Sequence, residues 1–113
     1  MAFPTDNEDW LLEVADAVIR KEASGGVGSL TPWERLVHCL WVADYGMRNA
    51  GDLDAAGDLY PAFQSDGCRA AEELSLRLTR AAFAQTKSAL QQNYLDQFES
   101  ICNEIRRAEG SSS

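Results

Sequence analysis

The fold of this chain is decided by residues 31–51, TPWERLVHCLWVADYGMRNAG. The stretch opens with a capping box, in which the side chains of Thr31 and Glu34 can each accept a hydrogen bond from the other residue's backbone. Pro32 suits the first helical position, and Gly51 tolerates the left-handed backbone that often ends a helix. The apolar residues in between cover a broad helical face: Trp33, Leu36, Val37, Leu40, Trp41 and Met47. The sequence therefore predicts a central helix that is the most buried element.

Two further apolar stripes predict helices at the ends of the chain. Near the N-terminus, Thr5 or Asp6 can cap a helix, whose apolar positions are Trp10, Leu11, Val14, Ala17 and Val18. The glycine-rich run at 24–29 ends this helix in a loop. The last helix carries the stripe Tyr94, Phe98, Ile101, Cys102 and Ile105.

The middle of the chain predicts shorter elements. A short helix spans about Asp54 to Tyr60, and turns follow at Pro61 and at Ser65-Asp66-Gly67. The next helix has the apolar stripe Leu74, Leu78, Ala81 and Ala82. Because no segment alternates apolar and polar residues as a strand does, we expect an all-α fold: one bundle of four to five helices, without a sheet, over residues 1–109. Residues 110–113, GSSS, have the composition of a disordered tail.

Charge and composition restrict the classes of function. The 113 residues suit one domain and include 18 acids against 10 bases, a net charge of −8. This balance argues against direct binding to nucleic acid or to an anionic membrane, so a charged partner should be basic. No apolar run approaches the roughly 20 residues of a membrane span, and the N-terminus does not resemble a secretory signal. We therefore expect a cytoplasmic protein, with its three widely spaced cysteines reduced.

The first helix carries four carboxylates at regular spacing. They recur at i, i+3, i+7 and i+10, which places them along one helical face: Asp6, Asp9, Glu13 and Asp16. Such a face can dock a basic protein, or imitate the charge of a nucleic-acid backbone toward a DNA-binding protein. The alternative is an ordinary solvated face, since acids are favoured near a helix N-terminus.

A second acidic segment runs from Asp52 to Asp66, and its candidate partner-binding residues are Asp52, Asp54, Asp58 and Asp66. Its beginning resembles a calcium loop, but Ala56 and Phe63 occupy positions where such a loop needs side-chain ligands. An acidic loop with helix-capping aspartates explains the segment better, so we predict no metal.

Catalytic signatures are weak. His38 is the single histidine, and its neighbour Cys39 points about 100° away around the helix. The cysteines lack the C-x-x-C spacing of zinc and redox sites. We predict no catalytic residue and no cofactor. The competing hypothesis is a small hydrolase or ligand-binding bundle that uses His38, Cys39 or the loop 52–58, and it requires at least two of these to converge on a pocket.

The segment Leu30-Thr31-Pro32-Trp33-Glu34-Arg35-Leu36-Val37, followed by Tyr45-Gly46-Met47-Arg48-Asn49-Ala50-Gly51, resembles the DMP19-like family of small acidic helical bacterial proteins. Leu59-Tyr60-Pro61-Ala62-Phe63 and the helix from Ala70 resemble later parts of that family, so the resemblance covers about residues 28–85. The turn departs from the family's Asn-Gly-Gly, because Ala50 stands at its centre. The resemblance implies a helical fold and, for the best-known member, mimicry of DNA toward a transcription factor.

The leading hypothesis is thus a non-enzymatic acidic interaction module, in the form of a DNA mimic or of an immunity or antitoxin-type inhibitor of a basic protein. A symmetric homodimer is a further expectation, because residues 68–87 reverse the charge and place Arg69, Arg77 and Arg80 opposite the acidic first half.

Overall fold

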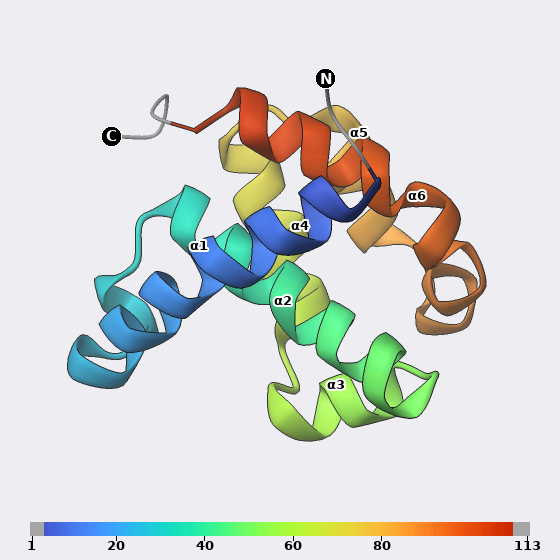
Figure 1. Ribbon diagram of the computed structural model, residues 1–113, viewed down its shortest axis with the longest axis horizontal. Coiled ribbons are helices and arrows are strands. Elements are labelled where there is room, and N and C mark those ends of the chain that lie inside the picture. The colour runs from blue at the N-terminus through green and yellow to red at the C-terminus, as the bar shows by residue number, and fades with distance from the viewer. Residues whose placement is uncertain (1–3, 110–113) are drawn as a thin grey trace.

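The structure is a computed structural model that describes residues 4–109 (Figure 1). Within this range the chain forms six α-helices and one 3₁₀ turn and contains no strand, in the order α1 (Pro4–Gly25), η1 (Val27–Ser29), α2 (Pro32–Ala50), α3 (Asp54–Leu59), α4 (Phe63–Glu73), α5 (Arg77–Ala84) and α6 (Lys87–Arg107). The all-α prediction is confirmed, but four to five helices is too low a count. The predicted tail at 110–113 lies outside the described residues.

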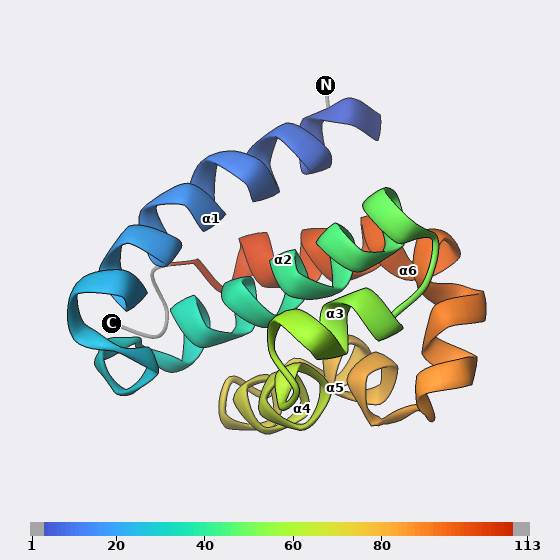
Figure 2. The same cartoon turned by 90° about the horizontal axis from the view of Figure 1, so that it is seen from below.

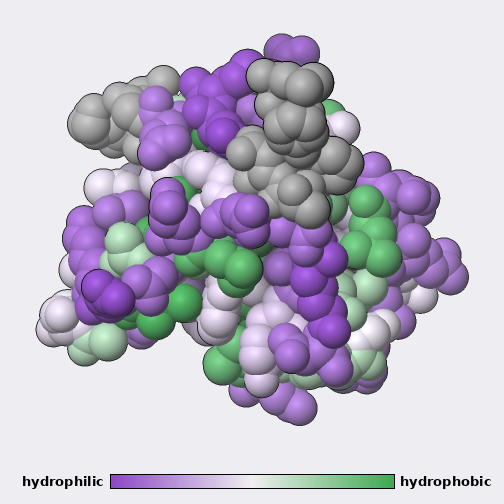
Figure 3. All heavy atoms as spheres, in the orientation of Figure 1, coloured by the Kyte–Doolittle hydropathy of each residue, from purple (hydrophilic) through white to green (hydrophobic). Residues whose placement is uncertain are grey.

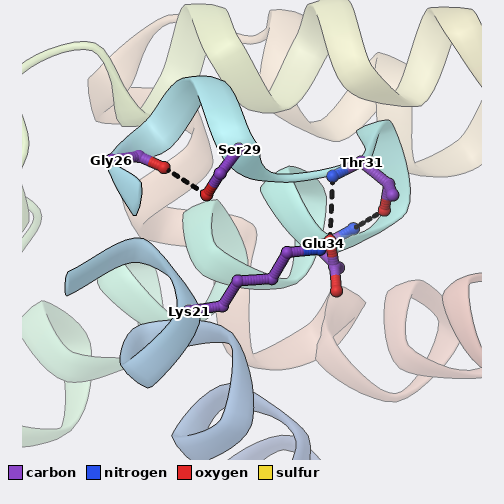
Figure 4. A network of polar contacts seen from close by, with 5 residues as sticks. All are labelled: Lys21, Gly26, Ser29, Thr31 and Glu34. Carbon is purple, nitrogen blue, oxygen red and sulfur yellow. Dashed lines mark hydrogen bonds and ion pairs between the residues drawn. The ribbon is translucent and has the colours of Figure 1, made fainter. Parts of the chain in front are cut away.

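Helix α2 forms as the sequence predicts. The hydroxyl of Thr31 accepts from the backbone N–H of Glu34 at 3.1 Å, and the Glu34 carboxylate accepts from the N–H of Thr31 at 2.9 Å. The helix ends at Gly51, whose φ of 75° is left-handed. Figure 4 shows this cap together with Lys21, which reaches from α1 to the Glu34 carboxylate at 2.7 Å. Although burial alone would raise the pKa of Glu34, the bonds from Lys21 and Thr31 lower it overall. The cap therefore also ties α1 to α2.

Helix α2 lies in the middle of the molecule, with α1 on one side and α4 and α5 on the other (Figure 2). It contributes ten buried residues, among them Leu36, Val37 and Leu40 with no exposed surface. The indole N–H of Trp33 donates to the carbonyl of Ile105 at 3.0 Å, which joins the start of α2 to the end of α6. The stripe predicted for the last helix is fully buried against this core.

Helix α1 presents most of the predicted stripe to the core: Leu11 and Val18 are buried, and Trp10 and Val14 pack against the core. The predicted core residue Ala17 is exposed, whereas Ala15 and Asn7 are buried beside Leu11 and Val18. The Asn7 amide donates to Glu99 at 2.5 Å, and its oxygen accepts from Arg106 at 2.8 Å. This polar contact with α6 helps to fix the rotation of α1, and apolar spacing alone does not reveal it.

The predicted turn at Ser65-Asp66-Gly67 is wrong, because these residues lie inside α4. Gly67 allows a close helix contact: a Cβ on this residue would lie 2.8 Å from the ring of Phe83 in α5. The chain turns instead at Ser75, whose φ is 60°. This break divides the predicted fourth helix, so that Leu78 and Ala81 are exposed.

The start of α5 is stabilised from another helix. The Glu104 carboxylate in α6 accepts from the backbone N–H of Leu78 at 3.1 Å and from the backbone and hydroxyl of Thr79 at 2.7 and 2.6 Å. No helix between residues 4 and 109 is both long and apolar enough to cross a bilayer.

Candidate interaction face

The acids of α1 lie on its outer side. Asp9, Glu13 and Asp16 are exposed, as predicted. Asp16 forms an ion pair with Arg20 at 2.8 Å, whereas Asp9 and Glu13 have no ion pair or hydrogen bond with any side chain of the described range. The side chain of Asp6 lies outside the described residues. The structure thus brings together three of the four predicted carboxylates, two of them without an ion pair in the described range.

The second acidic segment is largely used within the fold. The Asp52 carboxylate accepts from the backbone N–H of Asp54 at 3.1 Å and of Ala55 at 3.3 Å, and so caps α3. Asp54 is exposed and pairs with Lys87 of α6. Asp58 is exposed on the outer side of α3.

Asp66 points inward from the first turn of α4, and its side chain is only 16% exposed. It accepts a hydrogen bond from the Tyr60 hydroxyl. Burial, followed by this bond to a carboxylate, raises the pKa of Tyr60 above its ordinary value. Asp66 is therefore not part of the exposed acidic surface.

Two hollows open beside these acids and share Tyr45 as a wall. The first, of about 270 Å³, lies between α1 and α2 and is lined by Glu8, Leu12, Trp41, Asp44, Tyr45, Arg48 and Asn49. The second, of about 340 Å³, lies between α2 and α3 and is lined by Tyr45, Ala55, Asp58 and Leu59. We call the surface formed by Leu12, Trp41, Tyr45 and Leu59 the Tyr45 face.

The Tyr45 face exposes more apolar surface than the sequence predicts. Leu12 is 57% exposed, Leu59 47% and Tyr45 42%. Trp41 was assigned to the core with Trp10 and Trp33, but only Trp33 is buried; Trp10 and Trp41 are half-buried at the edge of the core. The one sequence signal for this face is Leu12, a large apolar residue outside the predicted stripe of its helix. On the side drawn in Figure 3, hydrophobic residues lie in separate groups among hydrophilic ones. Two further exposed leucines, Leu78 and Leu95, lie on α5 and α6.

The polar groups of the first hollow are already paired. Asp44 is buried and accepts from Arg48 Nε and from the Tyr94 hydroxyl, both at 2.8 Å. Arg48 also reaches Glu8 at 3.3 Å and lies over the ring of Phe98, 5.1 Å from its centroid. Burial and the Asp44 carboxylate together raise the pKa of Tyr94, so its hydroxyl stays a hydrogen-bond donor. Because Glu8 and Asp44 both pair with Arg48, the hollow suits an apolar side chain better than a free ion.

His38 and Cys39 line neither hollow. The His38 ring lies 5.3 Å from Tyr60 and 6.5 Å from Trp41, and its Nδ1 has no hydrogen-bond partner. Burial lowers the pKa of His38 and raises that of the Cys39 thiol, which makes the thiol a poor nucleophile. The ligand-binding hypothesis requires at least two of His38, Cys39 and the 52–58 segment to converge on a pocket. This is not seen at these hollows, where only Ala55 and Asp58 of the 52–58 segment are present.

Two of the three arginines predicted to face a partner are paired within the fold. Arg69 and Arg80 lie 3.8 Å from Asp66 and Glu72, respectively, and Arg77 is exposed at the start of α5. Among residues 4–109, no three His, Cys, Asp or Glu side chains are grouped so that they could hold a metal ion.

No family model, curated protein or solved structure matches this chain. The resemblance to the DMP19-like family therefore stays a prediction, as do the partner and the homodimer.

Proposed function

We propose that this chain is a non-enzymatic interaction module that binds a basic protein through the outer side of α1 and the Tyr45 face beside it. The observation that carries the proposal is the position of Asp9 and Glu13. These two exposed carboxylates form no ion pair in the described range, and they lie beside Leu12, which lines the first hollow.

Electrostatics supports a basic partner. Exposed acids that the protein's own bases do not neutralise create a negative potential, and the chain as a whole carries a net charge of −8. Such a field accelerates encounter with a positively charged surface and weakens as salt is added. A DNA-binding protein presents such a surface by necessity, since it must neutralise phosphates. We therefore favour a DNA-binding protein as the partner, which would make this chain a DNA mimic.

An immunity or antitoxin-type inhibitor is the second form of the proposal. It would use the same acidic surface, but its target need not bind DNA. Competition by duplex DNA separates the two forms, because only a partner that uses its DNA-binding site is displaced.

The test is an affinity capture from lysate of the source organism, with nuclease added, at low and high salt. A matched pair of charge-reversal variants makes it specific. Asp9→Lys with Glu13→Lys removes the proposed contacts, whereas Asp96→Lys with Glu109→Lys makes the same change of net charge at exposed sites on and just beyond α6.

We expect the wild type and the α6 variant to capture a basic protein at low salt, and the α1 variant to lose it. Release by competing duplex DNA supports mimicry, and retention in its presence supports the inhibitor. Equal capture by both variants, or capture that salt does not weaken, contradicts the proposal.

A further inference from the structure

We propose that the partner of this chain docks an amphipathic basic helix on the Tyr45 face, with one apolar side chain in each of the two hollows. This inference rests on the proposed function and adds the kind of segment that is recognised. It makes binding depend on apolar anchors as well as on charge.

The shape of the face favours a helix as the occupant. The C-terminal half of α2 lies between α1 and α3 in both ribbon views (Figures 1 and 2). Its exposed Tyr45 separates a hollow on the α1 side from one on the α3 side. Side chains one turn apart on a helix lie about 5–6 Å from each other on the same side, so one helix can offer an anchor to each of two neighbouring hollows.

The lining of the hollows favours apolar anchors. Leu12 and Leu59 stand at the two outer edges and are about half exposed. The buried carboxylate of Asp44 is already bonded to Arg48 and Tyr94, so an entering side chain need not supply a charge. Covering these leucines and the Tyr45 ring removes apolar surface from water, which is favourable.

The rim of the face sets the charge of the partner. Asp58 lines the second hollow, and Asp9 and Glu13 lie next to Leu12 along α1. A second copy of this chain would bring the same carboxylates against each other, which is unfavourable. A helix with lysines or arginines beside its apolar stripe instead places a positive charge opposite each rim acid.

The test uses synthetic peptides, because the partner itself is not required. The probe is a fluorescein-labelled peptide of about 18 residues, or five helical turns, with leucines at i, i+3, i+4 and i+7 and lysines at the other exposed positions. A scrambled peptide of identical composition has the same charge but no apolar stripe. Binding is measured by fluorescence anisotropy at low salt.

Two serine variants test the anchor. Leu12→Ser removes a wall of the first hollow, and Leu95→Ser removes an exposed leucine of α6 that lines neither hollow. Both sites are on the surface, so circular dichroism should show that both variants stay folded. We expect the amphipathic peptide to bind at least about tenfold tighter than the scrambled one, and Leu12→Ser to weaken it roughly tenfold, as expected for losing one buried leucine side chain. Leu95→Ser should bind like the wild type.

The outcomes separate this inference from the proposed function. One outcome is that both peptides bind the wild type equally, bind the Asp9→Lys and Glu13→Lys variant more weakly, and bind Leu12→Ser as well as the wild type. That result overturns helix docking, while charge-driven recognition survives. If neither peptide binds, the inference is overturned whatever the capture experiment gives. Concentration-dependent dimerisation of the free protein that Leu12→Ser abolishes would also overturn it, because a second copy would then occupy the face.

Discussion

The two acidic segments of this chain look alike in sequence and differ in structure. On α1, Asp9 and Glu13 are exposed and form no ion pair in the described range. Between α2 and α4, Asp52 caps a helix, Asp54 pairs with Lys87, and Asp66 accepts from Tyr60. A carboxylate that already has a partner offers little to a binding protein, so the number of acids in a segment is a poor guide to its function. The first segment is available for recognition, whereas most of the second stabilises the fold.

The largest effect on stability should come from the backbone contact that positions the second segment. Gly46 of α2 is so close to the start of α3 that a Cβ would lie 2.8 Å from the carbonyl oxygen of Asp52 and 2.9 Å from the N–H nitrogen of Ala56. Gly46→Ala should lower the free energy of unfolding by about 2 kcal/mol, because two backbones must separate. Urea denaturation measures this, with Gly57→Ala, whose added Cβ meets no atom within 4 Å, as the control. An equally stable Gly46→Ala variant would contradict the close approach.

The inward Asp66 should come next. Asp66→Ala leaves the Tyr60 hydroxyl without its acceptor and removes an acid from the first turn of α4, so we expect a loss of about 1.5 kcal/mol. A double-mutant cycle with Tyr60→Phe should show that the two losses are not additive. Additive losses would mean that the bond contributes nothing.

Replacing the capping aspartate should have a smaller effect. Asp52→Ala removes the acceptor for two backbone N–H groups of α3 and should cost about 1 kcal/mol. Asp58→Ala, on the exposed side of the same short helix, should change stability by less than about 0.5 kcal/mol. Thermal or urea denaturation of the pair decides the point: similar losses for both would show that net charge, and not capping, is responsible.

His38 makes the core beside the second segment sensitive to acid. Burial lowers its pKa from the ordinary 6.5 in the folded protein, despite the opposing effects of Glu22 and Asp66. As the pH falls, the unfolded chain therefore binds a proton at this histidine before the folded chain does. The contribution of His38 to the free energy of unfolding is complete above about pH 7.5 and declines as the pH drops through 6.5. His38→Gln, which does not titrate, should flatten this decline in urea denaturation between about pH 7.5 and 5.5. If the free energy of unfolding falls equally steeply with pH in the wild type and the variant, groups other than His38 cause the decline.

The smallest effect is expected on α1 itself. Asp9→Asn with Glu13→Gln removes two charges that have no partner in the described fold, so stability should stay within about 0.5 kcal/mol of the wild type. The same variant should lose much of the binding of the basic peptide. Loss of stability comparable to that of Asp52→Ala would show that the first segment is also structural, and the contrast between the two segments would disappear.

Local patterns predicted the parts of the fold that depend on neighbours in sequence. The cap at Thr31 and Glu34, the end of α2 at Gly51 and the buried stripe of α6 are all confirmed. The short helix at Asp54 ends within one residue of its predicted limit. In each case the deciding interaction joins residues no more than four positions apart, or it follows from helical periodicity alone.

The errors lie where a distant side chain decides the local structure. Gly67 looks like a turn residue, but it lies inside α4, where a Cβ would come within 2.8 Å of the ring of Phe83. One member of the predicted stripe of α1, Ala17, is exposed, whereas the polar Asn7 is buried against its partners on α6. Asp66 was expected at the surface of a loop, and the Tyr60 hydroxyl binds it inside. Glycine and aspartate favour turns only when no tertiary contact competes.

The sequence by itself determined the helical class, the central helix with both its ends, the last helix and the excess of negative charge, because these follow from composition and from interactions within one or two helical turns. Only the tertiary structure decided the division into six helices, the capping of α5 by Glu104 from 25 residues away, the internal pairing of the second acidic segment and the exposure of the Tyr45 face. These depend on which surfaces remain uncovered after packing, and no local pattern records how distant helices approach one another.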